Sequence, residues 1–125
     1  MRQVFLDTET TGLDAAQGDR IIEIGCIEFI NRRPSGRRLH HYVNPQRASH
    51  PDAVRVHGIT DDFLADKPLF ERIAPEVLAF VQGADVVIHN AAFDIGFLDA
   101  EFERLGLGSF AQKAARITDS LLMRS

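Results

Sequence analysis

The stretch VFLDTETTGLD, residues 4–14, decides how the rest of this sequence is interpreted. It opens like a buried β-strand and then places two acids, Asp7 and Glu9, where the strand should end. Side chains alternate between the two faces of a strand, so these acids point to the same side. Two carboxylates held this close repel each other, and a divalent cation relieves that repulsion. The pattern suggests a Mg²⁺ or Mn²⁺ site. A solvated turn with two capping acids has the same letters, and for such a short motif taken alone it is the commoner case.

Composition places the chain among ordinary globular proteins. Its 125 residues are enough for one domain, and 45% are hydrophobic and 26% charged. The single cysteine, Cys26, excludes a disulfide framework and favours a reducing compartment. There is no leader, and no apolar run approaches the roughly 20 residues of a bilayer crossing, so we expect a cytoplasmic protein without membrane contact. A net charge of −4 argues against a wide nucleic-acid surface, but not against a nuclease whose acids hold cations.

The order of the predicted elements is typical of an α/β fold. Strands are expected over 2–8, 20–33, 37–44, 84–90 and from 115, and helices over 70–82, 91–105 and towards 125. We expect residues 34–36 (PSG) to form a hairpin turn, 44–60 to be a loop, Thr60 to cap a helical turn and Pro75 to lie in the first turn of its helix. A meander followed by crossovers predicts a mixed central sheet flanked by helices, in one domain.

A second acid-bearing stretch, VVIHNAAFDIGFLDAEF (86–102), strengthens the reading of the first. It is a buried strand, a polar loop and a helix that opens with Asp94. Asp94 lies a few residues past the end of a strand, where open α/β sheets place their ligands. The alternative is an ordinary acid in the first turn of a helix, stabilised by the helix dipole.

Together the two stretches resemble the DEDD superfamily of 3′–5′ exonucleases. DTETTG (7–12) is similar to the first motif of that superfamily, and HNAAFDIGFL (89–98) is similar to the second. Three further stretches, 20–33, 55–70 and 115–122, resemble in the same order the exonuclease domains of the epsilon subunits of bacterial DNA polymerase III. The resemblance covers nearly the whole chain and implies a ribonuclease H-like fold.

The resemblance also implies a set of site residues. The catalytic acids, which would hold two Mg²⁺ or Mn²⁺ ions, are Asp7, Glu9 and Asp94. The implied substrate contacts are Thr8, Thr10, Asp52, His57 and Phe93. Asp52 stands where the family has a glutamate, and this shorter side chain puts the contact in doubt. Phe93 has the alternative of packing in the core at helical spacing.

The third motif of the family has no matching residues in this chain. It is a histidine, the general base, followed five residues later by an aspartate that binds metal. His57 with Asp62, and His89 with Asp94, share the spacing but lie too early and in segments matched to something else. A general base typically contributes about 10²–10⁴-fold in rate. The resemblance therefore implies a domain over 1–125 that lacks its C-terminal helices and is weakly active or inactive by itself.

The implied reaction is proofreading, in which 3′-terminal nucleotides are removed from a single-stranded DNA end. The implied partners are the catalytic subunit of DNA polymerase III and the other core subunits. Two alternatives stay open: an exonuclease that trims RNA ends, which shares the same carboxylates, and a non-catalytic module that docks a partner. The intact acids argue against the second. Asp119 is expected to be structural, as a cap of the final helix.

Overall fold

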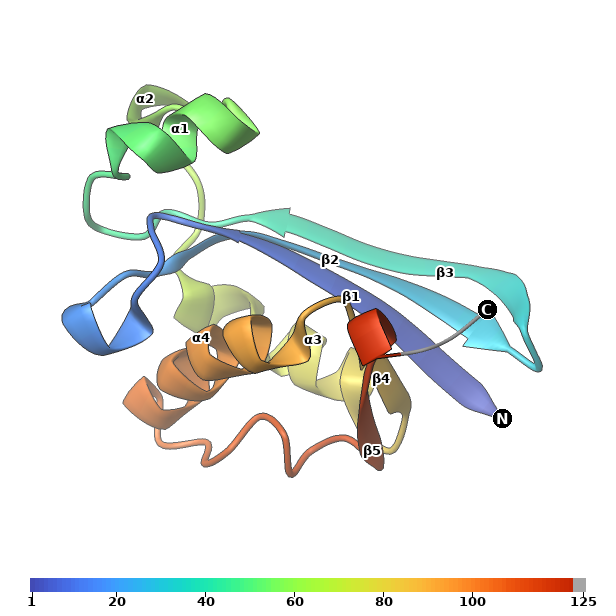
Figure 1. Cartoon of the computed structure of the whole chain (residues 1–125). Helices are drawn as coiled ribbons and strands as arrows, with labels where there is room; N and C mark the ends of the chain where they lie inside the picture. The colour runs from blue at the N-terminus through green and yellow to red at the C-terminus, as the bar shows by residue number, and fades with distance from the viewer. Residues whose placement is uncertain (123–125) are drawn as a thin grey trace.

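A central mixed sheet organises the structure, a computed structural model that describes residues 1–122 (Figure 1). Its five strands lie in the order β3-β2-β1-β4-β5. The strands are β1 (Arg2–Thr10), β2 (Ile21–Ile30), β3 (Arg33–Tyr42), β4 (Asp85–Ile88) and β5 (Arg116–Asp119). β2 pairs antiparallel with β1 and β3, whereas β4 runs parallel to β1 and β5. The predicted α/β class, with a meander before the parallel strands, is confirmed.

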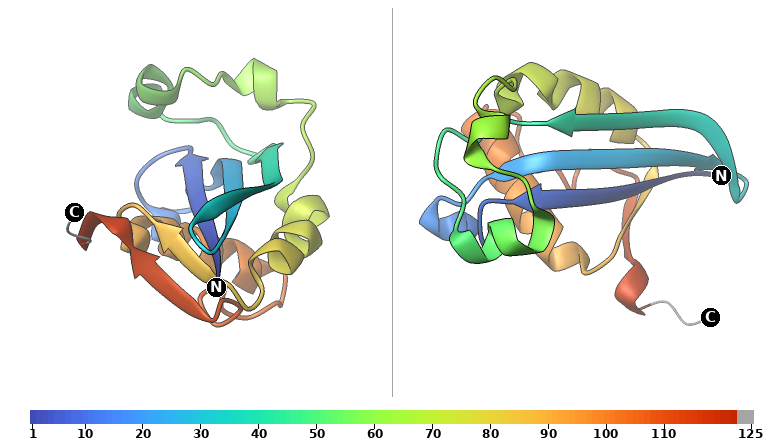
Figure 2. Two further views of the ribbon diagram at one scale, coloured as in Figure 1. Left: turned by 90° about the vertical axis from the view of Figure 1, so that its right-hand side faces the viewer. Right: turned by 90° about the horizontal axis from the view of Figure 1, so that it is seen from above.

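Two helices cover one face of this sheet, and two shorter ones stand apart from them at one end (Figures 1 and 2). The covering helices are α3 (Phe70–Val81) and α4 (Ala91–Arg104). The shorter elements are α1 (Pro51–His57), α2 (Asp61–Leu64) and the 3-10 turns η1 (Ala15–Gln17) and η2 (Ser120–Leu122). Within the described residues, no helix has the length and apolar character that crossing a membrane requires.

Alternation along β1 separates a core face from an open face. Val4 and Leu6 are buried against side chains of α3 and α4 in one hydrophobic core. Phe5, between them, is exposed on the opposite face, where its ring lies 4.9 Å from that of Phe29. The same alternation decides which of the following polar side chains turn away from the core.

The hairpin turn between β2 and β3 lies at Asn31 and Arg32, so its prediction at residues 34–36 was wrong. Both turn residues have positive φ, 49° and 70°, as in the two-residue turns whose twist suits a hairpin. Residues 34–36 belong to β3, and the pairing with β2 is irregular between Ile27 and Phe29. A proline and a glycine are tolerated there because β3 is an edge strand.

Of four further expectations, two were wrong, one was confirmed, and one lies partly outside the described residues. Residues 44–60 include α1, which starts with Pro51, a residue suited to the first helical position because it lacks an N–H. Pro75 lies in the second turn of α3, on its exposed side. The Thr60 cap is confirmed, since its Oγ1 accepts a hydrogen bond of 3.2 Å from the N–H of Phe63. The expected final helix is the 3-10 turn η2, and residues 123–125 lie outside the described part.

Candidate active site

Asp7 and Glu9 lie at the carboxyl end of β1, in the part of the strand that extends past β4. The pairing of β4 with β1 runs from Gln3 to Phe5, so the two acids follow the end of that ladder. Thr8, between them, is buried on the core side, whereas Asp7 is exposed and Glu9 half-buried. The acids therefore share one side of the strand, and a regular element rather than a flexible loop holds them.

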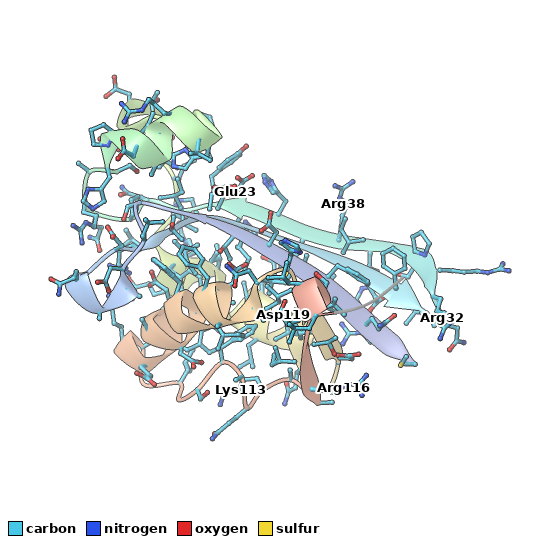
Figure 3. The ribbon with its side chains drawn as sticks, viewed as in Figure 1. Glu23, Arg32, Arg38, Lys113, Arg116 and Asp119 are labelled. Atoms are coloured by element: carbon cyan, nitrogen blue, oxygen red, sulfur yellow. The ribbon has the colours of Figure 1, made fainter. Side chains whose placement is uncertain are left out.

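Asp94 reaches the same region from the first turn of α4. The chain passes from β4 into α4 through Asn90, which has a φ of 61°. Asp119, labelled in Figure 3, lies at the end of β5 and holds this turn. Its carboxylate accepts hydrogen bonds from the N–H groups of Asn90, at 3.0 Å, and Ala91, at 3.1 Å. Asp119 also accepts one from Leu121 in η2. Asp119 therefore caps η2, as expected for the final helical segment, and it also holds the start of α4, which the sequence did not indicate.

The carboxylates of Asp7, Glu9 and Asp94 influence one another. Burial and then repulsion from Asp7 raise the pKa of Asp94 to about 7. Burial and then repulsion from Asp7 also raise the pKa of Glu9. Asp94 is 5% exposed, and its Oδ2 is buried with no hydrogen-bond partner among residues 1–122. An unpaired buried carboxylate oxygen is costly, so this site favours a proton or a cation.

The carboxylate oxygens of Asp7, Glu9 and Asp94 are of the type that binds a hard divalent cation. In this structure the three side chains do not meet at a single point. Across the described residues, no group of three His, Cys, Asp or Glu side chains lies close enough to hold a metal ion as they stand. Mg²⁺ and Mn²⁺ prefer oxygen ligands, and Mg²⁺ usually keeps several waters beside one or two carboxylates. The unpartnered Oδ2 of Asp94 belongs to a carboxylate that both Asp7 and Glu9 repel, and such a group fits an ion of this kind.

Beside the acids lies a cleft of about 790 Å³ between the end of β1, the loop after it and α1. All the side chains predicted to contact substrate line this cleft: Thr8, Thr10, Asp52, His57 and Phe93. Glu9 lines it too, whereas Asp7 lines a second hollow of about 480 Å³ together with His40 and His89. The structure therefore gathers residues that are widely separated in the sequence. Their role in binding remains a prediction.

The side chains that line the cleft differ in their contacts with the rest of the protein. The Nδ1 of His57 accepts a 3.0 Å hydrogen bond from the N–H of Ile59, so the proton of the neutral ring is on Nε2. That Nε2 is buried and has no partner among the described residues. Phe93 packs against the core, which was the alternative to a substrate contact, and it also lines the cleft. Asp52 is exposed and pairs with Arg55 on its own helix.

Leu13 and Val56 are cleft residues that the sequence did not single out. They are 85% and 84% exposed, which is unusual for aliphatic side chains, and both line the cleft. Leu13 follows the first motif directly, and Val56 precedes His57. The signal in the sequence was an apolar residue beside each motif, in segments without the periodicity of a buried element.

The chain matches the family model described as Exonuclease, of the RNase T type, over residues 4–124. It is 48% identical over 126 residues to DNA polymerase III subunit epsilon of Pasteurella multocida, which covers 98% of this chain and 50% of that protein. With the same subunit of Escherichia coli the identity is 52% over 108 residues, covering 83% and 44%. The chain spans about half the length of the curated relatives it matches.

Solved structures of exonuclease I share the fold. One of them gives a TM-score of 0.85 at 23% sequence identity, covering 96% of this chain and 28% of that one. A metal-free complex of E. coli exonuclease I with single-stranded DNA gives the same score and coverage. The sheet order and its covering helices are thus those of the ribonuclease H-like exonuclease fold. By the family match and the identity to its relatives, the chain belongs to the exonuclease family, to which the sequence motifs pointed.

Proposed function

We propose that this chain forms the metal-binding and nucleotide-binding part of a 3′–5′ exonuclease that removes nucleotides from single-stranded DNA ends. The observation that carries the proposal is the buried Asp94 carboxyl, whose pKa is raised by burial and by repulsion from Asp7 and Glu9. Of these acids, Glu9 lines the cleft. Perturbed acids gathered beside a cleft are typical of catalytic sites. A structural ion pair would have provided Asp94 with a basic partner.

Asp7, Glu9 and Asp94 would hold two Mg²⁺ or Mn²⁺ ions. Such ions supply charge stabilisation at the phosphate and a more acidic water. The pKa of Asp94 is about 7, so this carboxyl must lose its proton when a cation binds. Cation binding should therefore release protons near neutral pH, and it should weaken as the pH falls below 7.

The cleft would receive the terminal nucleotide. Leu13 and Val56 offer exposed aliphatic contacts for a base, and Phe93 offers an aromatic ring. The Nε2–H of His57, buried and unpaired, can donate to a sugar or phosphate oxygen. None of the residues 1–125 matches the histidine base of the family, so we expect this chain alone to cleave slowly.

The curated relatives suggest a role for the longer protein of which this chain would be a part. The curated relatives are DNA polymerase III epsilon subunits, of which this chain spans about half the length. We infer a proofreading role with the catalytic subunit and the other core subunits of that polymerase as partners, in the cytoplasm. Cys26 is free and buried, which agrees with a reducing compartment.

The test begins with Mn²⁺ binding followed by electron paramagnetic resonance, because it does not depend on the rate of cleavage. We expect binding by the parent chain and at least a tenfold loss, roughly, in Asp94→Asn and Asp7→Asn. Asp66→Asn, on an exposed side chain paired with Lys67, serves as the matched control. Binding that is equally strong in all variants would refute the assignment of the acids.

Degradation of matched DNA and RNA oligonucleotides with Mn²⁺ then tests the substrate class. We expect slow removal of 3′-terminal nucleotides from DNA, lost in Asp94→Asn. A rate on RNA that equals or exceeds the rate on DNA would favour the RNA-trimming alternative, because the 2′-OH distinguishes the two substrates. A chain extended towards the length of its relatives should cleave faster.

A further inference from the structure

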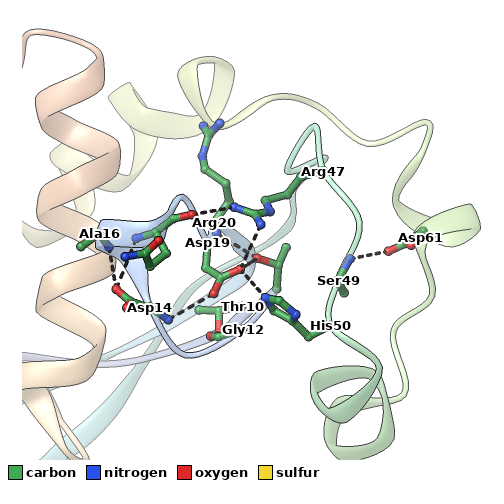
Figure 4. A network of polar contacts seen from close by, with 12 residues as sticks. Thr10, Gly12, Asp14, Ala16, Asp19, Arg20, Arg47, Ser49, His50 and Asp61 are labelled. Atoms are coloured by element: carbon green, nitrogen blue, oxygen red, sulfur yellow. Dashed lines mark hydrogen bonds and ion pairs between the residues drawn. The ribbon is translucent and has the colours of Figure 1, made fainter.

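The carboxylate of Asp19 lies at the centre of a polar network beside the cleft (Figure 4). Asp19 is 4% exposed, which is rare for an acid without several partners. Its Oδ1 accepts a 2.8 Å hydrogen bond from the Thr11 hydroxyl and lies 3.3 Å from Nε2 of His50 and 3.8 Å from an Arg47 nitrogen. Its Oδ2 accepts a 3.2 Å hydrogen bond from the N–H of Asp14. These interactions lower the pKa of Asp19 despite its burial.

These partners belong to two separate loops. Residues 11–14 follow β1, and residues 47–50 precede α1. The loops also touch directly, because the N–H of His50 donates a 2.8 Å hydrogen bond to the carbonyl of Thr11. Gly12 has no space for a side chain, since a Cβ would lie 2.3 Å from Cδ2 of His50 and 2.4 Å from the Asp19 carboxylate. We call this contact of the two loops around Asp19 the Asp19 junction.

Helix α1 directly follows the Asp19 junction in the chain. None of its residues is buried, so it has no core contact that would fix it. His50, at the junction, is the residue immediately before α1, and the side chain of His50 makes no cap bond to the helix. Yet α1 carries Asp52, Val56 and His57 into the cleft, opposite Glu9 and the loop after β1. The contacts of His50 therefore bear on the width of the cleft, together with a 3.0 Å hydrogen bond from the N–H of Ser49 to the carboxylate of Asp61 in α2 (Figure 4).

We propose that Asp19 is a positioning residue for the nucleotide site: it holds α1 across the cleft through His50 and Arg47. The inference rests on the proposed function for the identity of what the cleft binds. Asp19 lies at the edge of the cleft, and its oxygens are occupied by partners within the protein. Its effect on binding is through His57 and Val56, whose places depend on α1.

The first measurement concerns geometry and needs no ligand. Nitroxide labels at Ala16→Cys on η1 and Arg55→Cys on α1 report the distance across the cleft, because both residues are exposed and Cys26 is buried. We expect one narrow distance distribution in the parent chain and a broad one in Asp19→Asn. An unchanged distribution in Asp19→Asn would overturn the proposal.

The second measurement is binding of thymidine monophosphate with Mn²⁺ present, alongside Mn²⁺ binding alone. We expect Asp19→Asn to weaken nucleotide binding about tenfold, as loss of a charged hydrogen-bonded partner does, while Mn²⁺ affinity and the exposed control Asp66→Asn stay unchanged. A role in stability alone would lower the melting temperature and leave the nucleotide affinity of the folded protein as it was, which would overturn the proposal.

His50→Gln keeps the test decisive if Asp19→Asn folds poorly, because the His50 side chain is more than half exposed. His50→Gln should broaden the distance distribution and weaken nucleotide binding. The double variant Asp19→Asn/His50→Gln should lose less nucleotide affinity than the sum of the losses in the two single variants. Additive losses would show that the two residues act separately and would overturn the proposal. If the parent chain bound no nucleotide, the proposed function would fail, whereas the distance distributions would still decide whether Asp19 holds α1.

Discussion

The guanidinium of Arg20 donates two hydrogen bonds to the carboxylate of Glu101, one to each oxygen, at 2.8 and 2.7 Å. Glu101 is 2% exposed and lies on α4, whereas Arg20 directly precedes β2. This pair fastens the helix that carries Asp94 to the sheet. We expect Glu101→Gln to lower the free energy of unfolding by about 2–4 kcal/mol, because it leaves the Arg20 charge without its partner. Urea unfolding measures this, and Glu103→Gln, exposed on the same helix, should change little.

The stability of the protein without added cations should fall as the pH rises from about 4 to about 7. In that range the folded protein keeps a proton on Asp94, whose pKa is raised from 3.8 to about 7, and the unfolded chain has released it. Asp94→Asn removes the effect, so it should be more stable than the parent by about 2–4 kcal/mol at pH 8 and not at pH 4. Urea unfolding at several pH values with a chelator tests this. A difference that does not vary with pH would contradict the environment described for Asp94.

Asp119→Asn should loosen the start of α4. An amide side chain cannot accept hydrogen bonds at both of its ends, so either Asn90 or Ala91 loses its partner. We expect faster hydrogen exchange at these amides and roughly tenfold weaker Mn²⁺ binding, because Asp94 lies in the same turn. Nuclear magnetic resonance of the amides and a Mn²⁺ titration measure the two effects. Unchanged exchange with unchanged affinity would show that α4 is held by other contacts.

Two glycines should respond to alanine in opposite directions. Gly12→Ala should destabilise the protein by about 1–3 kcal/mol, because the new methyl group meets His50 and Asp19 at the Asp19 junction. Gly96→Ala should stabilise it by about 0.5–1 kcal/mol, because Gly96 lies inside α4 and no described atom outside the helix's own backbone and its two neighbours lies within 4 Å of a Cβ there. Thermal unfolding of the two variants tests this pair. The same sign of change in both would contradict the packing at Gly12.

Arg32→Gly should stabilise the hairpin at the far end of β2 and β3 (Figure 3). Arg32 has a φ of 70°, which strains a residue with a Cβ, whereas glycine adopts this conformation freely. Asn-Gly is moreover the preferred pair for such a turn. We expect a gain of about 0.5–1 kcal/mol by urea unfolding. The control, Arg33→Gly at the first residue of β3, should lose stability.

The parts of the fold that the sequence predicts are those governed by local periodicity. Alternation along β1 places Asp7 and Glu9 on one side, and the helical spacing after residue 91 leads to α4. The rule that ligands lie beyond strand ends places Asp94 in the same region. These features need a single element or two successive ones, so neighbouring residues carry enough information to predict them.

The parts that were missed depend on contacts between distant residues or on weak signals. The turn at Asn31 and Arg32 lacks the glycine that such turns prefer. Residues 34–36 contain proline, serine and glycine, which are typical of turns, so the turn was predicted there. Helix α1 has no buried residue and therefore no apolar periodicity to reveal it. Asp19 finds its partners up to 31 positions further along the chain, at His50, and no local pattern indicates such a meeting.

Helix α1 shapes the cleft yet contributes no side chain to the core. Substitutions on its surface can therefore change the shape of the cleft with little effect on the stability of the fold. The acids have no such freedom, because they are built into β1 and the buried start of α4. On the proposed function, the substrate preference can therefore be adjusted on one wall of this cleft while the metal-binding acids on the other wall stay unchanged.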